Sequence, residues 1–167
     1  VQQSLGNLQR AEGDLDAALV SYQQALKIHA TIGNQLGIGA SLTYMARTFI
    51  RQGRFSAAVL ALDEALSIDR TIRDRHGEML DLSDQGEALW ASEALQAALG
   101  AWWQARQLAH AIAAPQAHNL DQLFAQIAQQ IGQDEWAQLQ AGLAGNAETW
   151  RQQAVDAIRQ QLEQAND

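Results

Sequence analysis

Apolar residues recur at steps of three and four along the stretch GDLDAALVSYQQALKI, residues 13–28. This spacing places them on one face of an α-helix, with the polar residues between them facing solvent. The apolar positions are Leu15, Ala18, Leu19, Tyr22, Ala25, Leu26 and Ile28. Gly13 suits the end of a preceding helix, and Asp14 suits the N-cap of this one. The pattern therefore predicts a turn at Gly13 followed by an amphipathic helix.

The same pattern returns twice, at intervals of 40 residues. The copies read GRFSAAVLALDEALSI over residues 53–68 and EALQAALGAWWQARQL over residues 93–108. Small residues form two columns, Ala18, Ala58 and Ala98, and Ala25, Ala65 and Ala105; large residues form two more, Tyr22, Leu62 and Trp102, and Leu15, Phe55 and Leu95. Side-chain size that recurs at a fixed spacing indicates a structural repeat.

The segment before each copy repeats as well. A small residue stands seven positions before each turn: the small residues are Gly6, Ala46 and Gly86, and the turns are at Gly13, Gly53 and Glu93. A small side chain lets a second helix cross closely, whereas a large one would overpack the crossing by ~1–3 kcal/mol. Each unit is therefore predicted to be two antiparallel helices that bury their apolar faces by stacking on the next unit. We expect helices near residues 1–11, 14–32, 35–51, 54–72, 76–91, 94–112, 118–131, 134–143 and 147–165.

This order of small residue, glycine, large residue, alanine, large residue and alanine resembles the tetratricopeptide repeat. Three copies fill it: Gly6-Gly13-Leu15-Ala18-Tyr22-Ala25, Ala46-Gly53-Phe55-Ala58-Leu62-Ala65, and Gly86-Glu93-Leu95-Ala98-Trp102-Ala105. A fourth, degenerate copy fits with a one-residue slip at Phe124, Ala125, Ala128, Gly132, Ala137 and Ala144. The usual period is roughly 34 residues. The longer spacing here is similar to the subclass found in kinesin light chains and in bacterial signalling proteins.

The resemblance implies an all-α fold, a right-handed α-solenoid of antiparallel helix pairs in a TPR-like superhelix. We expect a single array over residues 1–167, with repeats near 1–33, 34–73, 74–114 and 117–145. A helix near 147–165 is predicted to form a C-terminal cap, with Trp150, Ala154, Ile158 and Leu162 on one stripe. The chain begins at Val1, inside an expected helix, so we expect it to be a fragment of a longer protein.

Composition narrows the possible functions. The 167 residues include no cysteine, which excludes a disulfide framework and a thiolate metal site. The apolar runs are far shorter than the ~18 residues that span a bilayer, so we expect no membrane insertion. No signal-peptide pattern opens the sequence, and we expect a cytoplasmic protein. The net charge of −8 disfavours binding to nucleic acid.

No pattern typical of an active site or a cofactor site occurs. The four histidines, His29, His76, His110 and His118, are scattered over different units and lack the spacing of metal ligands. The acidic turn around Asp69, Asp74, His76, Glu78 and Asp81 is predicted to be a solvated loop between repeats, with a divalent-ion site as the alternative. We therefore expect neither catalysis, nor a cofactor, nor a bound metal.

The resemblance implies a scaffold that binds a peptide or protein segment in the concave groove formed by the first helix of each pair. The groove residues that it implies are Gln3, Asn7, Arg10, Thr43, Arg47, Ile50, Arg51, Ser83, Glu87, Trp90, Gln122, Gln126, Gln129 and Gln130. We expect the arginines to contact acidic groups of the partner and Trp90 to hold an apolar anchor. The alternative is a regulatory or self-assembly segment of a larger enzyme or signalling protein, which contacts its own chain or a second copy.

Overall fold

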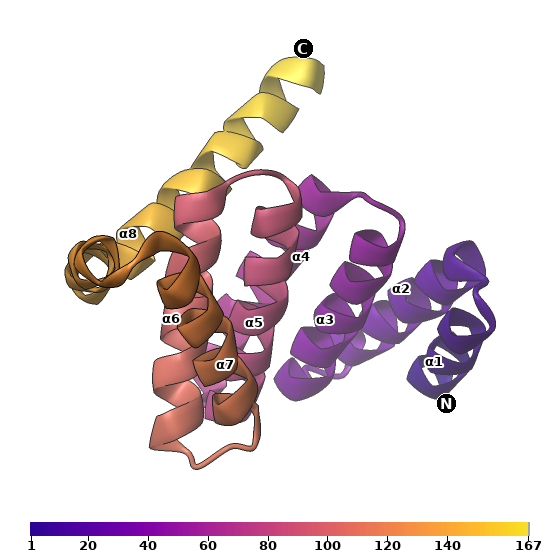
Figure 1. Cartoon of the computed structure of the whole chain (residues 1–167). Coiled ribbons are helices and arrows are strands. Elements are labelled where there is room, and N and C mark those ends of the chain that lie inside the picture. Colours follow the sequence, from indigo (N-terminus) through magenta and orange to yellow (C-terminus); the bar gives the residue numbers. More distant parts are fainter. Residues whose placement is uncertain (167) are drawn as a thin grey trace.

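A computed structural model describes residues 1–166 of the chain, the last of them by its backbone alone. These residues form eight α-helices and no strand, which confirms the predicted all-α fold. The helices are α1 (Gln2–Glu12), α2 (Leu15–Thr31), α3 (Gln35–Arg51), α4 (Phe55–Ile72), α5 (Arg75–Ala91), α6 (Leu95–Ala111), α7 (Gln116–Ile131) and α8 (Gln133–Asn166). The first seven begin and end within two residues of their predicted bounds. In Figure 1 the helix pairs α1–α2, α3–α4 and α5–α6 follow one another from right to left.

Short turns with a local cap join the helices. Asp14 accepts a hydrogen bond of 3.0 Å from the backbone N–H of Ala17 and so caps α2. Gly13 and Gly53 follow α1 and α3 with φ angles of 89° and 72°, a region that L side chains rarely adopt. Glu93 takes the same place after α5 with a φ of 65°, so the third unit makes this turn without glycine. The predicted turns are therefore confirmed in all three units.

A small residue of the first helix faces a large residue of the second helix in each unit. A methyl group on Gly6 would lie only 2.6 Å from Cε1 of Tyr22, and one on Gly86 would overlap the indole ring of Trp102. In the middle unit the two positions hold alanine and leucine, and both side chains are fully buried. Side-chain sizes are thus matched across each crossing, as the repeated columns predict.

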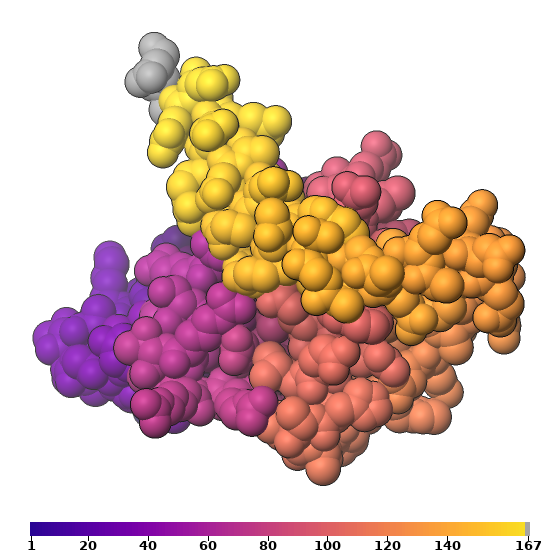
Figure 2. Space-filling view, turned by 90° about the vertical axis from the view of Figure 1, so that its left-hand side faces the viewer, coloured from indigo at the N-terminus to yellow at the C-terminus, as the bar shows by residue number. Residues whose placement is uncertain are grey.

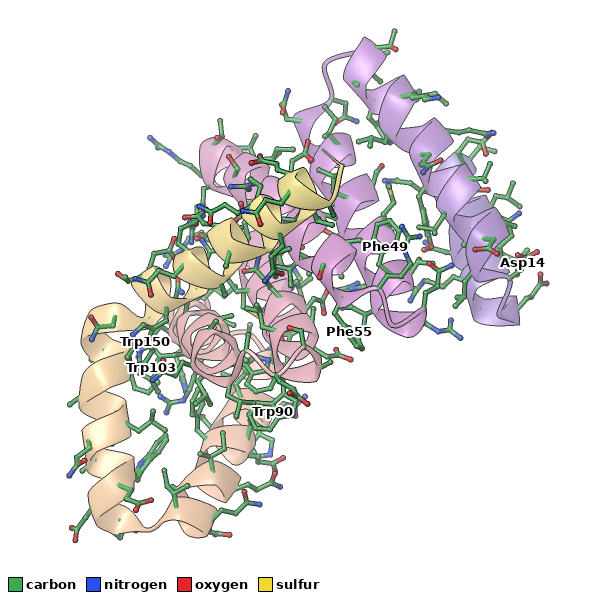
Figure 3. All side chains as sticks on the ribbon, turned by 90° about the horizontal axis from the view of Figure 1, so that it is seen from above. Asp14, Phe49, Phe55, Trp90, Trp103 and Trp150 are labelled. Carbon is green, nitrogen blue, oxygen red and sulfur yellow. The ribbon has the colours of Figure 1, made fainter. Side chains whose placement is uncertain are left out.

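The eighth helix differs from the prediction. Separate helices near 134–143 and 147–165 are predicted, but α8 is continuous, so this prediction is wrong. Figure 3 shows α8 running beside α7 and then turning near Trp150 toward the rest of the molecule. Gly142 and Gly145 precede this turn. A glycine in a helix costs only ~0.5–1 kcal/mol relative to alanine, so a pair of glycines permits a bend without ending the helix.

The second part of α8 lies across the second helices α4 and α6 (Figure 2). A methyl group on Gly100 of α6 would lie 2.5 Å from the carbonyl oxygen of Ala147, so the two backbones approach closely there. Arg151 is 1% exposed, and its guanidinium donates to Asp63 of α4 and to Gln85 of α5, both at 3.0 Å. The capping helix therefore covers one face of the array as well as its end.

The row of first helices is interrupted after α5. Within the described residues, α3 contacts both α1 and α5, but α7 contacts α6 and α8 and not α5. Figure 3 shows α7 and the first part of α8 side by side, standing away from the other helices. They resemble a helix pair that does not continue the row, and the fourth repeat over residues 117–145 stays a prediction. None of the described helices is both long and apolar enough to cross a membrane.

Candidate functional site

The groove residues implied by the resemblance lie on α1, α3, α5 and α7, and none of them is fully buried. The half-buried residues are Gln3, Asn7, Arg10, Thr43, Arg47, Ile50 and Ser83. The exposed residues are Arg51, Glu87, Trp90, Gln122, Gln126, Gln129 and Gln130. The half-buried group belongs to the first three units, and the amides of α7 are the most solvated part of the set.

Polar side chains connect neighbouring first helices at the repeat spacing. Gln3 of α1 donates to Oγ of Ser41 on α3 at 3.1 Å. One period later, Thr43 of α3 donates to Oδ1 of Asp81 on α5 at 2.7 Å. We call these two bonds the polar ladder. Gln3 and Thr43 therefore hold α1, α3 and α5 together, which occupies much of their hydrogen-bonding capacity.

The polar ladder does not continue from α5 to α7. Counting 40 residues on from Asp81 gives Asp121, but its carboxylate accepts from Arg106 Nε at 2.5 Å and lies 3.0 Å from His110 Nε2, both on α6. A cleft of about 240 Å³ lies between α5, α6 and α7 at this point. We call it the Trp90 cleft; it is lined by Trp90, Trp102, Leu123, Gln126, Ile127 and Gln130.

Two tryptophans form one wall of the Trp90 cleft. The rings of Trp90 and Trp102 have centroids 5.6 Å apart and an interplanar angle of 37°. Trp102 is anchored because its Nε1 donates to the backbone carbonyl of Ser83 at 3.1 Å. Trp90 remains 47% exposed. Trp103, by contrast, makes an edge contact with Phe124 at 5.7 Å, and Figure 3 places it near the bend of α8, away from Trp90.

The three arginines expected to attract an acidic partner are not equivalent. Arg47 Nε donates to Asp84 at 2.6 Å, so its charge is already paired. Arg51 is exposed, and its guanidinium donates to the backbone carbonyl of Arg10. Arg10 is half-buried, and its Nε has no hydrogen-bond partner among residues 1–166. The cationic surface is therefore concentrated at Arg10 and Arg51, at the C-terminal ends of α1 and α3.

Two carboxylates of the acidic turn are buried, so the prediction of a solvated loop is wrong for them. Asp69 is 5% exposed and Asp81 is 1% exposed. Burial, together with the charges of Asp74 and Glu78, raises the pKa of Asp69 to about 6. Burial raises the pKa of Asp81 to about 8, although a hydrogen bond from Thr43 opposes the rise. The helix pairs stack tightly enough here to remove both groups from water.

Metal ligation has no structural support. No group of three or more His, Cys, Asp or Glu side chains in the described part of the chain could hold a metal ion. The two histidines that flank one turn do not meet. His110 is bonded to Asp121, and Nε2 of His118 lies 2.9 Å from the amide nitrogen of Gln122. The divalent-ion alternative for the acidic turn is therefore not pursued.

Comparison with known proteins agrees with this architecture. Residues 2–71 match the family profile described as tetratricopeptide repeat, which covers the helices from α1 to the last turn of α4. No curated protein matches the chain. The third helix pair lies outside the matched segment and repeats the same close crossing, with Gly86 against Trp102. The chain is therefore a tetratricopeptide repeat protein.

Proposed function

We propose that this protein is an interaction scaffold that binds an extended segment of a partner along its first helices, with an apolar partner side chain in the Trp90 cleft. Tetratricopeptide repeats in general mediate protein–protein interaction. The observation that carries the proposal is the half-exposed indole of Trp90 beside a concave cleft. A large aromatic side chain left in water at a hollow, rather than on a flat face, is typical of a binding hot spot.

The Trp90 ring is held in place before any partner arrives. Its neighbour Trp102 is anchored to the backbone of Ser83, and the two rings are in contact. A pre-positioned ring loses little conformational entropy on binding, so more of the contact energy is available as affinity. Leu123 and Ile127 provide apolar walls on the opposite side of the cleft. An aliphatic or aromatic side chain of the partner fits this lining.

The surroundings of the cleft suit a peptide backbone. The exposed amides of Gln126 and Gln130 line the cleft and can both donate and accept hydrogen bonds. At the other side of α5, Arg51 stands exposed with its guanidinium close to the end of α1. We infer that an acidic group of the partner contacts Arg51, because a guanidinium binds carboxylates with two parallel hydrogen bonds.

Selection from a random peptide library on the immobilised chain tests the proposal. We expect Trp90→Ala to weaken binding of the selected peptides by ~2 kcal/mol or more, which is about 30-fold in Kd. The matched control is Val20→Ala, which removes an exposed apolar side chain of α2 outside the groove. Arg51→Glu should weaken binding and reduce its dependence on salt. Affinities are measured by fluorescence titration at two salt concentrations.

Unchanged affinity in both Trp90→Ala and Arg51→Glu would overturn the proposal. The self-assembly alternative makes a different prediction, namely that the chain alone associates with a second copy. Sedimentation of the wild-type chain at rising concentration separates the two, because a peptide scaffold stays monomeric whether or not Trp90 is present. Circular dichroism of each variant shows that the helices are retained.

A further inference from the structure

A second hollow lies on the first helices, at the opposite end of α5 from Trp90. It is a cavity of about 160 Å³ between α3 and α5, under the last turn of α4. We call it the Asp69–Asp81 pocket; its walls are Leu36, Ala40, Thr43, Tyr44, Arg47, Leu80 and the turn residues Asp74, His76 and Gly77, with the two aspartates inside. A single liquid water occupies roughly 30 Å³, so the hollow has room for several heavy atoms.

The two carboxyl groups in the pocket lack the donors that would normally accompany buried charge. Oδ1 of Asp81 accepts from Thr43 at 2.7 Å, but no donor in residues 1–166 reaches Oδ2. The neighbouring polar group is the carboxyl of Asp69, which is also an acceptor when ionised. A buried acceptor without a donor costs ~1–3 kcal/mol, and more when it is charged. The pocket is therefore built around an unmet demand for a hydrogen-bond donor with positive charge.

Neighbouring glycines make room for the Asp69 carboxyl. A methyl group on Gly39 would lie 3.0 Å from Oδ1 of Asp69, and one on Gly77 would overlap Oδ2. The other junctions fill the same positions with uncharged or titratable groups: His29 packs on Gly37, and Ala109 stands where Ala117 follows. The carboxylate is thus specific to the junction between the second and third units.

The charges around the pocket do not neutralise it. Arg47 of α3 is already paired with Asp84, and Arg70 of α4 is paired with Glu78 and Glu148. Asp74 also lines the hollow, and its carboxylate is used to cap α5. The balance of groups that face the two buried aspartates is acidic.

We propose that the Asp69–Asp81 pocket takes the cationic end of a lysine or arginine side chain from the bound partner segment. This inference rests on the proposed function and names a feature of the partner. The apolar walls at Leu36, Tyr44 and Leu80 would cover the methylene stem, while the ammonium or guanidinium donates to both carboxylates.

The spacing of the two hollows adds a constraint on the partner. Asp81 and Trp90 are nine residues apart on α5, which is a rise of about 14 Å. Nine residues also turn the helix by about half a revolution, so the two sites face opposite neighbours, α3 and α7. A diagonal across a helix of ~10 Å diameter is about 17 Å, which about five extended residues span. We expect a basic residue and an apolar residue at roughly this separation in the partner segment.

Cation binding at the pocket should depend on pH. Without a ligand the two facing carboxyls retain a proton near neutral pH, because their pKa values are raised to about 6 and about 8. A cation binds the ionised pair and displaces that proton, so affinity should rise from pH 5 to pH 8. Protonation of His76 at low pH would act in the same direction, and His76→Gln separates its share. Asp74, Glu78, Asp84, Arg47 and Arg70 are the other charged groups near the pair.

The pocket can be tested with small probes that contain no apolar anchor. The probes are N-acetyl-arginine amide, N-acetyl-lysine amide and the uncharged N-acetyl-citrulline amide, titrated into the whole chain and followed by NMR. We expect saturable shifts of the Gly39 and Gly77 amide signals with the two cationic probes and none with citrulline. Affinity should fall at least about tenfold between pH 8 and pH 5.

Variants of the carboxylates complete the test. Asp81→Asn and Asp69→Asn should each abolish the response, while Glu64→Gln, at an exposed glutamate of α4, should leave it unchanged. Thermal unfolding by circular dichroism checks that each variant is folded. Trp90→Ala should also leave the response unchanged, so a failed groove proposal and a failed pocket proposal give different results. Equal shifts with citrulline, no saturable shift, or a response to calcium or magnesium instead would overturn the inference.

Discussion

The junction between α3 and α5 and the junction between α5 and α7 are built from similar sequence but differ in structure. In the first, Thr43 reaches across to Asp81, and the two helices are in contact. In the second, Asp121 turns back to α6, and the Trp90 cleft separates the helices. The difference shows that a repeated pattern specifies each helix pair more firmly than it specifies how the pairs join.

One residue of α6 accounts for much of this difference. The column that holds Leu26 and Leu66 in the first two units holds Arg106 in the third. A leucine there joins the core, whereas Arg106 presents a cation that pairs with Asp121 and lies 5.6 Å from the ring of Trp103. The charged side chain draws α7 toward α6 and away from α5.

The largest expected contrast comes from the same leucine deletion on the two sides of α5. Leu82→Ala removes a fully buried side chain from α5, and it should lower the free energy of unfolding by about 2–5 kcal/mol. Leu123→Ala acts on a half-buried side chain that lines the open cleft, and it should cost less than about 1 kcal/mol. Urea unfolding of both variants measures the difference. Similar losses in the two variants would mean that the cleft is closed in solution.

The two aspartates should respond to pH in opposite directions. Asp81 keeps its proton in the folded state up to a pKa of about 8, whereas it ionises at 3.8 when unfolded, so its contribution to stability is lost as pH rises through this window. Between pH 5 and pH 7, Asp81→Asn should therefore gain about 1–3 kcal/mol of stability relative to wild type. Burial of Asp69 acts in the same direction at the lower end of this range.

Asp121 provides the matched control for that pH experiment. Hydrogen bonds from His110 and Arg106 lower its pKa below 3.8, so its contribution is present near neutral pH and is lost only in acid. Asp121→Asn should therefore be slightly less stable than wild type at pH 7, with a difference that shrinks below pH 4. Chemical unfolding across pH 3–8 measures both variants. A gain of stability on removing Asp121 at pH 7 would contradict the assignment.

The smallest expected effect concerns the ion pair that holds α7. Arg106→Leu restores the leucine of the column and removes the pairing with Asp121. Exposed ion pairs contribute ~0–1 kcal/mol, so we expect the amides of α7 to exchange with solvent up to about fivefold faster, with no change in α3. Arg54→Leu, at an exposed arginine before α4, is the control. Slower exchange in α7 would show instead that the leucine lets α7 pack against α5.

The helix pairs could be predicted because their determinants are local. Gly6 and Tyr22 are 16 residues apart, as are Gly86 and Trp102, and each pair recurs at the same period, so size matching is visible in the sequence. The glycine at Gly77 carries a similar signal, since it stands one period after Gly37 and makes room for Asp69. That match between a buried carboxylate and a missing side chain could have indicated the pocket.

The path of α8 could not be predicted in the same way. Arg151 contacts Asp63 and Gln85, which lie 88 and 66 residues earlier, and no repeat spacing connects them. The groove was also only partly predictable. The sequence places Arg47 and Arg51 on one helix face, but only the folded chain shows that Arg47 is already paired.

The buried guanidinium of Arg151 has a consequence for how the molecule comes apart. A stack in which each unit touches only its neighbours unfolds like a one-dimensional chain, and its ends can melt independently. Here Arg151 bonds to α4 and α5 as well as to Glu148 within α8, and α8 also packs on α6. Burial alone would raise the pKa of Glu148, but its bonds with Arg151 and Arg70 outweigh this and lower it to about 2. The C-terminal end is thus coupled directly to the middle of the array, so these units melt cooperatively and the end does not fray first.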